Sequence, residues 1–275
     1  MTSIYLTERQ VRKRERGRKI KFYGVFGASI FLLGGLIYAV FYSPLFKVAS
    51  IQIVVETSDF LRGEDKLIFE KQLIENFRGE LSNKPLLSKF LGEDNILNWY
   101  LKNSGMAESV KQKYPYLANI SIQKNIFKRQ IDILVSRREY FGVWCLSEEC
   151  WWFDKSGVIF AEAPRIDGEL TYQVRDDTQN RALGIGSKIL DDRLLPNLFK
   201  IFDVLEKSDF RWRSLKLENL DLEEITTGSE LNPQIYFSLR NDPSSALLVL
   251  QSAKQSGLDK AQYIDLRVEN RVYYK

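Results

Sequence analysis

The sequence has 275 residues, of which 44% are hydrophobic and 28% charged, a composition typical of a chain with one or two folded domains. It contains no histidine, which excludes Ser-His-Asp triads, Cys-His nucleophiles and His-ligated metal centres. Its two cysteines alone cannot build a four-cysteine zinc site or hold an iron–sulfur cluster, so we expect no cofactor.

The formal net charge of +4 is unevenly distributed along the chain. Residues 1–21 carry eight Lys or Arg side chains against two Glu, whereas the remainder carries slightly more acidic than basic side chains. Such a basic segment is found in nucleic-acid-binding arms and on the cytoplasmic side of membrane helices. Because the rest of the chain is not basic, we expect no nucleic-acid partner.

Residues 22–42 form a stretch of 21 uncharged residues rich in Phe, Leu, Ile and Val. As a helix this stretch is about 31 Å long, which matches the hydrocarbon core of a bilayer. The basic residues before it predict that residues 1–21 are a cytoplasmic head and that the rest lies outside the cytoplasm. A cleaved secretory signal is the alternative, but the apolar run exceeds a signal's usual core and no Ala-x-Ala-like site follows it. We therefore expect a single-pass protein of the plasma or inner membrane that contacts the lipid bilayer through residues 22–42.

Cys145 and Cys150 flank Leu-Ser-Glu-Glu between two aromatic, β-favouring segments, a pattern typical of a β-hairpin. Such a hairpin places the two side chains opposite each other, and a disulfide persists outside the cytoplasm. We interpret the pair as a candidate structural disulfide. A free or redox-active pair is the alternative, although the spacing is not Cys-x-x-Cys and no basic residue adjoins either cysteine.

The segment after the apolar stretch predicts a first domain over residues 45–137. Within it, Phe69, Leu73 and Phe77 recur at helical spacing, and two later runs alternate as strands do. The predicted elements are a strand at 46–56, a helix at 65–79, two helical stretches at 94–103 and 107–114 that Gly105 separates, and strands at 117–125 and 129–137.

Residues 138–275 predict a second domain, made of short strands, turns and two helical stretches. The fold class is therefore α+β, with a single transmembrane helix ahead of both domains. The predicted strands lie at 139–146, 150–160, 214–222, 233–240 and 261–275, and the predicted helices at 193–208 and 243–257.

Three pairs of adjacent acidic residues are the candidates for general acid/base catalysis that remain without histidine. These pairs are Asp176–Asp177, Asp191–Asp192 and Glu223–Glu224. Adjacent acids lie more often in solvated turns, so we expect no enzymatic activity. Gly184 and Gly186, ahead of Lys188, fit a tight turn better than a phosphate-binding loop, because the third Gly and the Walker spacing are absent.

The last predicted strand alternates polar and apolar residues. Tyr263, Asp265, Arg267 and Glu269 share one face, and Ile264, Leu266 and Val268 share the other. A terminal strand often lies at a sheet edge, where unpaired N–H and C=O groups accept a partner strand by β-augmentation. An ordinary core strand with protected edges explains the alternation equally well.

Five segments occur in the order of a known family: FKVASIQI, YPYLANISIQKN, QIDILVSRREYFGVW, FDKSGVIF and YIDLRVENRVYYK. On these segments, and over essentially its whole length, the sequence resembles the FtsQ/DivIB family of bacterial cell-division proteins. The family's Asp-Leu-Arg signature falls on Asp265, Leu266 and Arg267, and its turn pair falls on Asp154 and Gly157.

Two regions depart from the family pattern. The family often has Glu-Arg-x-Pro before the Trp of the next strand, whereas residues 137–140 read Arg-Arg-Glu-Tyr ahead of Trp144. The stretch over residues 80–93 is also longer than the family needs, as if it contained an insert.

The resemblance implies that residues 45–137 are a POTRA domain and that residues 138–275 are a β-domain whose last strand binds a partner. It implies a divisome scaffold at the division septum, not an enzyme, that binds FtsB/DivIC-like and FtsL-like single-pass coiled-coil proteins and helps regulate septal cell-wall synthesis. No small-molecule substrate is implied. The partner-binding positions carried over are Tyr263, Ile264, Leu266, Val268, Asn270, Val272 and Tyr274. The alternative function is that of a membrane-anchored POTRA docking protein in secretion or envelope assembly.

Overall fold

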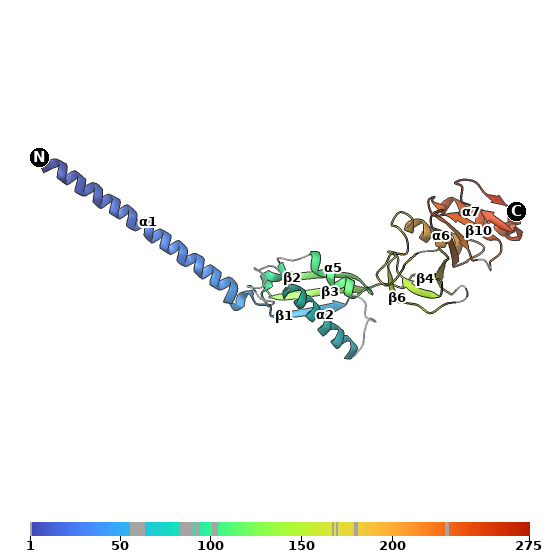
Figure 1. Cartoon of the computed structure of the whole chain (residues 1–275), viewed down its shortest axis with the longest axis horizontal. Coiled ribbons are helices and arrows are strands. Elements are labelled where there is room, and N and C mark those ends of the chain that lie inside the picture. The colour runs from blue at the N-terminus through green and yellow to red at the C-terminus, as the bar shows by residue number, and fades with distance from the viewer. Residues whose placement is uncertain are drawn as a thin grey trace. The chain divides into compact units, whose positions relative to one another are not determined.

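The protein has a mixed α+β fold in which one N-terminal apolar helix precedes two β-sheets, as Figure 1 shows for the computed structural model, and the chain divides into two compact units. The first unit comprises residues 1–110 and 120–135, and the second comprises 111–119 and 136–275. The structure describes residues 2–55, 64–82, 91, 94–100, 104–166, 168, 170–178, 181–228 and 231–275. Most of the predicted insert at 80–93 lies outside the described residues.

Helix α1 (Thr2–Tyr42) begins in the basic head and continues through the apolar stretch. Its last 22 residues, Lys21–Tyr42, are long and apolar enough to cross a membrane, and none of this hydrophobic window is buried in the protein. Ser29 Oγ, a polar atom in the middle of the stretch, donates to the backbone O of Val25 at 2.9 Å. The helix therefore satisfies this hydroxyl internally, as a span through lipid requires.

The sheet of the first unit contains three strands in the order β1-β3-β2: β1 (Ser50–Val55), β3 (Gln130–Arg137) and β2 (Leu117–Asn125). Strand β1 lies parallel to β3, with Ile51 opposite Ile131 and Ile53 opposite Ile133. Strands β2 and β3 are neighbours joined by the turn 126–129. Ile51 and Ile53 of β1 thus share one face with the β-branched residues of β3, which are fully buried, whereas Val54 lies on the other face and is exposed.

Three helices with buried apolar residues lie between β1 and β2 in the described part of the chain: α2 (Glu64–Ser82), α4 (Ile96–Tyr100) and α5 (Ser104–Lys113). The predicted stripe on α2 is confirmed, because Phe69, Leu73 and Phe77 are all buried. Phe77 also packs against Trp99 of α4, with ring centroids 6.4 Å apart. The predicted break at Gly105 is wrong, since Gly105 lies in the first turn of α5.

The second unit contains a mixed sheet with the strand order β12-β11-β10-β9-β8-β7-β4-β5-β6. Two of its strands were not predicted, β7 and β9, because each is short and lacks a clear alternation of apolar residues. The strands are β4 (Gly142–Leu146), β5 (Glu149–Phe153), β6 (Ile159–Glu162), β7 (Tyr172–Asp176), β8 (Ser214–Asn219), β9 (Glu224–Thr227), β10 (Gln234–Ser238), β11 (Tyr263–Asp265) and β12 (Tyr273–Tyr274).

Helix α6 (Leu195–Lys207) packs against one face of this sheet with buried residues that include Leu198, Phe202 and Leu205. Adjacent strands of the sheet contribute buried residues to the same core, among them Trp144, Val174, Leu215, Ile225, Phe237 and Ile264. The predicted helix at 243–257 is interrupted, and its pieces are η2 (Pro243–Ser245), α7 (Ala246–Gln251) and α8 (Ala253–Ser256), followed by η3 (Leu258–Lys260). The break falls at Ser252, whose hydroxyl bonds back to the carbonyls of Leu248 and Val249.

Candidate functional site

The predicted strand at 261–275 is two strands, β11 and β12, that run antiparallel and are joined by a turn. The N–H of Arg271 donates to the O of Val268 at 3.2 Å, and Asn270 has a positive φ of 59°. Asn tolerates this left-handed conformation better than most residues. The prediction of one continuous strand is therefore wrong between Leu266 and Val272, because the alternation of residue types conceals a turn.

Strand β11 is an interior strand of the sheet. It lies parallel to β10, with Ile264 opposite Ile235, and the N–H of Leu266 donates to the O of Tyr236 at 2.9 Å. On its other side, β11 pairs with β12, with Ile264 opposite Tyr274. The edge of the sheet is consequently β12, which has only two residues.

Strand β12 presents unpaired backbone groups outward. The N–H of Lys275 donates to the O of Tyr263 at 3.3 Å, so the backbone of Lys275 faces β11. Because N–H and C=O groups alternate in direction along a strand, those of the preceding residue, Tyr274, face away from the sheet. The side chains of Tyr273 and Tyr274 are 47% and 65% exposed. The edge therefore offers one donor, one acceptor and two phenol rings to an incoming strand.

The turn is held in place by an ion-pair cluster on Arg267. Its Nε and Nη2 donate to the two carboxylate oxygens of Asp265 at 2.9 and 2.6 Å, and its Nη1 donates to Glu224 Oε2 at 2.7 Å. The guanidinium also lies over the ring of Tyr236, 5.4 Å from its centroid. The hydrogen bonds from Arg267 lower the pKa of Asp265, and those to Asp265 and Glu224 raise the pKa of Arg267. Asp265 and Arg267 thus fix the end of β11 to β9 and β10.

A cavity of about 250 Å³ lies between this turn and the segment η2–α7. The turn contributes Leu266, Val268 and Val272 to its lining, and the helical segment contributes Pro243 and Val249. The amide of Asn241, also in the lining, donates to the O of Arg267 at 3.0 Å. The cavity can accept an apolar side chain from a chain that pairs with the neighbouring edge.

The residues predicted to bind a partner have different surroundings in the structure. Ile264 is fully buried in the core, and Leu266 and Val272 pack partly against it. Val268, Asn270 and Tyr274 are exposed beside the edge, whereas Tyr263 is half-buried. Sequence reasoning missed Tyr273, which the edge also exposes. Reading Glu-Asn at 269–270 as a turn signal would have placed Tyr273 in a hairpin strand.

Ahead of β4, Arg138 forms an almost completely buried ion pair with Asp154, with Nη1 and Oδ2 2.6 Å apart. Arg138 Nε also donates to the O of Pro115 at 2.8 Å. Burial alone would raise the pKa of Asp154, but hydrogen bonds from Ser156, Arg138 and the N–H of Val158 outweigh it and lower this pKa. Arg138 therefore ties the segment before β4 to the turn that follows β5.

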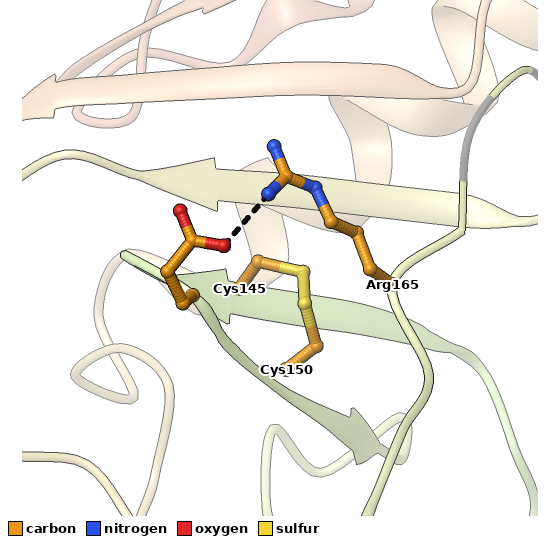
Figure 2. The surroundings of a disulfide bond; sticks show 4 residues. Cys145, Cys150 and Arg165 are labelled. Atoms are coloured by element: carbon orange, nitrogen blue, oxygen red, sulfur yellow. Dashed lines mark hydrogen bonds and ion pairs between the residues drawn. A yellow bond between two sulfur atoms is a disulfide. The ribbon is translucent and has the colours of Figure 1, made fainter.

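Cys145 and Cys150 lie opposite each other on β4 and β5 and form a disulfide with an S–S distance of 2.00 Å (Figure 2). Arg165 lies beside the pair, and its Nη1 contacts Glu148 Oε2 of the same hairpin at 2.9 Å (Figure 2). A second cavity, of about 560 Å³, adjoins the disulfide on the sheet face opposite α6. Its charged lining residues are Arg165, Arg175 and Lys216.

The acidic pairs that could have served catalysis have separate, mostly ionic partners. Asp176 is buried and accepts from Trp144 Nε1 at 3.1 Å and from Arg181 Nη1. Glu223 contacts Arg193 and Arg240, and Asp192 contacts Lys188. Among the described residues, no group of three or more His, Cys, Asp or Glu is placed to hold a metal ion.

The glycines at 184 and 186 form a tight turn. Gly186 has a φ of 92°, which favours glycine, and the N–H of Ser187 donates to the O of Gly184 at 2.9 Å. The turn then pairs with the start of β6, where the N–H of Ile159 donates to the O of Ser187 at 2.9 Å. The backbone of residues 187–188 therefore pairs with the segment at Val158 and Ile159.

No protein-family model matches the chain, and no curated protein is significantly similar to it in sequence.

Proposed function

We propose that the chain is a membrane-anchored division scaffold of the FtsQ/DivIB type, without enzymatic activity. The sequence resemblance supports this proposal, as do the apolar helix at residues 22–42 and the basic head before it. We further propose that the first unit is a POTRA domain, since its described elements run from one strand through several helices to two further strands, and its sheet order is β1-β3-β2. The N-terminus would then lie in the cytoplasm, and the residues after the apolar helix, with both sheets, would lie outside it at the division septum.

A single feature carries the binding proposal: the backbone N–H and C=O of Tyr274 face away from the sheet at its edge strand, β12. A strand from an FtsB/DivIC-like protein, itself joined to an FtsL-like protein, adds to β12 and bonds to these two groups. One of its apolar side chains enters the cavity beside Val268 and Val272. The two added backbone bonds set the position of the strand, and the cavity selects its side chain.

The substitution Tyr274→Pro tests this edge. Pro removes the outward N–H of residue 274 and leaves the inward groups of Lys275 free to bond to Tyr263. The residue before it, Tyr273, is already in a strand, the conformation that a following Pro favours. Full-length protein in detergent-solubilised membranes should lose its captured small coiled-coil partners with Tyr274→Pro.

The matched control is Tyr274→Ala, which removes the same phenol ring but keeps the N–H. Capture by Tyr274→Ala should exceed capture by Tyr274→Pro, because the backbone bond remains. Val268→Glu places a charge at the cavity and should also weaken capture. Undiminished binding by both Tyr274→Pro and Val268→Glu would contradict the edge as the binding site. Uniform distribution of the full-length protein around the membrane, rather than at the septum, would favour a docking role in secretion or envelope assembly.

A further inference from the structure

The β2–β3 turn of the first unit lies at the end of its sheet that is nearest to helix α1. Because β1 and β3 are parallel, the first residue of β1, Ser50, lies opposite the first residue of β3, Gln130. Ser50 follows the end of α1 by only eight residues. The turn 126–129, which precedes β3 directly, must therefore lie on the same side as the exit of the helix.

Direct contacts fix the turn and its neighbours to the end of the helix. Arg129 Nη1 donates to the O of Pro44 at 2.8 Å, and the N–H of Ala49 donates to the O of Arg129 at 2.7 Å. Asn95 Nδ2 donates to the O of Val40, in the last turn of α1, at 2.9 Å. These bonds join three separate chain segments around the point where the apolar helix ends.

The side chains exposed at this point are large apolar ones together with two lysines. Phe127 is 100% exposed at the tip, next to Ile126 at 45%, and Leu45 after the helix is 71% exposed. Lys47 and Lys128 are exposed among them, and neither has an ion-pair partner within the described part of the chain. The acidic residue Asp94 is also exposed. It lies close to these residues, because its backbone O accepts a hydrogen bond from the N–H of Val48 at 2.7 Å.

We propose that this turn is a lipid-binding site that docks the first unit on the outer surface of the membrane. Phe127, Ile126 and Leu45 enter the headgroup region of the bilayer, while the ammonium groups of Lys47 and Lys128 bind lipid phosphates. Apolar and aromatic side chains flanked by cations are the combination that an interface of headgroups and acyl chains accepts. The inference rests on the proposed membrane anchor and is independent of the partner bound at β12.

The experiment uses the full-length protein in vesicles of phosphatidylcholine and phosphatidylglycerol. Phe127→Cys is labelled with an environment-sensitive fluorophore without reductant, so that the Cys145–Cys150 disulfide stays closed. Leu33→Cys, inside the apolar helix, reports the anchor, and Leu248→Cys is a control site on α7 that is 77% exposed. We expect the label at residue 127 to emit at shorter wavelength than the label at 248 and to be quenched by spin-labelled lipid.

The outcomes separate the turn from the anchor. If the label at 33 is quenched by lipid while the label at 127 behaves like that at 248, the turn does not bind lipid and the anchor stands. If the label at 33 is not quenched, both the anchor and the docking inference fail. As a second measurement, the double variant Lys47→Gln/Lys128→Gln should reduce lipid quenching at residue 127 and leave it unchanged at 33. Unchanged quenching at 127 would overturn the role of the two lysines.

Discussion

The ion pair between Arg138 and Asp154 shows how single residues hold the start of the second unit. Both side chains are almost completely buried, and Arg138 bonds to two separate parts of the chain, Pro115 and the turn at Asp154. A buried charge whose partner is removed is left uncompensated. Arg138 therefore has a structural role at the start of the second unit.

We predict that Asp154→Asn lowers the free energy of unfolding of the second unit by roughly 3 kcal/mol at neutral pH. The folded pKa of Asp154 is lowered, so the carboxylate stabilises the fold fully above its unfolded pKa of about 3.9 and loses this effect as the pH falls through the folded value. Urea unfolding between pH 7 and 2 should show the difference between wild type and variant shrinking below about pH 4. A difference that stays constant over this range would assign the loss to packing instead of charge.

At the scale of elements, the β4–β5 hairpin combines strand pairing with a covalent link. Replacing Cys145 and Cys150 by Ser should lower the free energy of unfolding by about 2 kcal/mol, because the loop that the disulfide closes in the unfolded chain is short. Thermal unfolding with and without reductant measures this loss. Reductant should destabilise the wild type and leave the double variant unaffected, and equal melting of the two proteins would contradict a stabilising bond.

Element boundaries were predictable where apolar residues recur with a clear period. Leu117–Asn125 and the stripe on α2 illustrate this, because burial on one face imposes the period. Strand β7 has only one fully buried apolar residue, Val174, so its sequence carries no such signal. The turn at 268–271 was concealed for the opposite reason: the alternation of β11 continues as far as Glu269, inside the turn, where Asn270 reverses the chain.

The candidate site could be located from the sequence only to within this last segment. Which strand forms the edge depends on strand order, and that order is decided by pairing between distant residues, such as Ile235 with Ile264. The cavity beside Val268 depends in the same way on Pro243 and Val249, some twenty residues earlier. Neither local propensity nor periodicity contains such information.

At the scale of the whole molecule, the two units have separate hydrophobic cores. Phe77→Ala removes a fully buried ring from the first core and should destabilise that unit by about 3 to 5 kcal/mol. Hydrogen exchange followed by mass spectrometry should show faster exchange in β1 and β3, with unchanged exchange in β4 and α6. Matched acceleration in both units would mean that they unfold as one.

The parallel pairing of β1 with β3 also determines the order in which the first unit can form. Ser50 lies opposite Gln130, so β1 waits for a partner strand that is made eighty residues later. At about 5 to 20 residues per second, synthesis of that interval takes roughly 4 to 16 s. During this time the β-branched strand that follows the apolar helix has no native neighbour, and such strands aggregate readily. The nascent first unit is consequently a predicted client of chaperones until residues 130–135 arrive to complete its sheet.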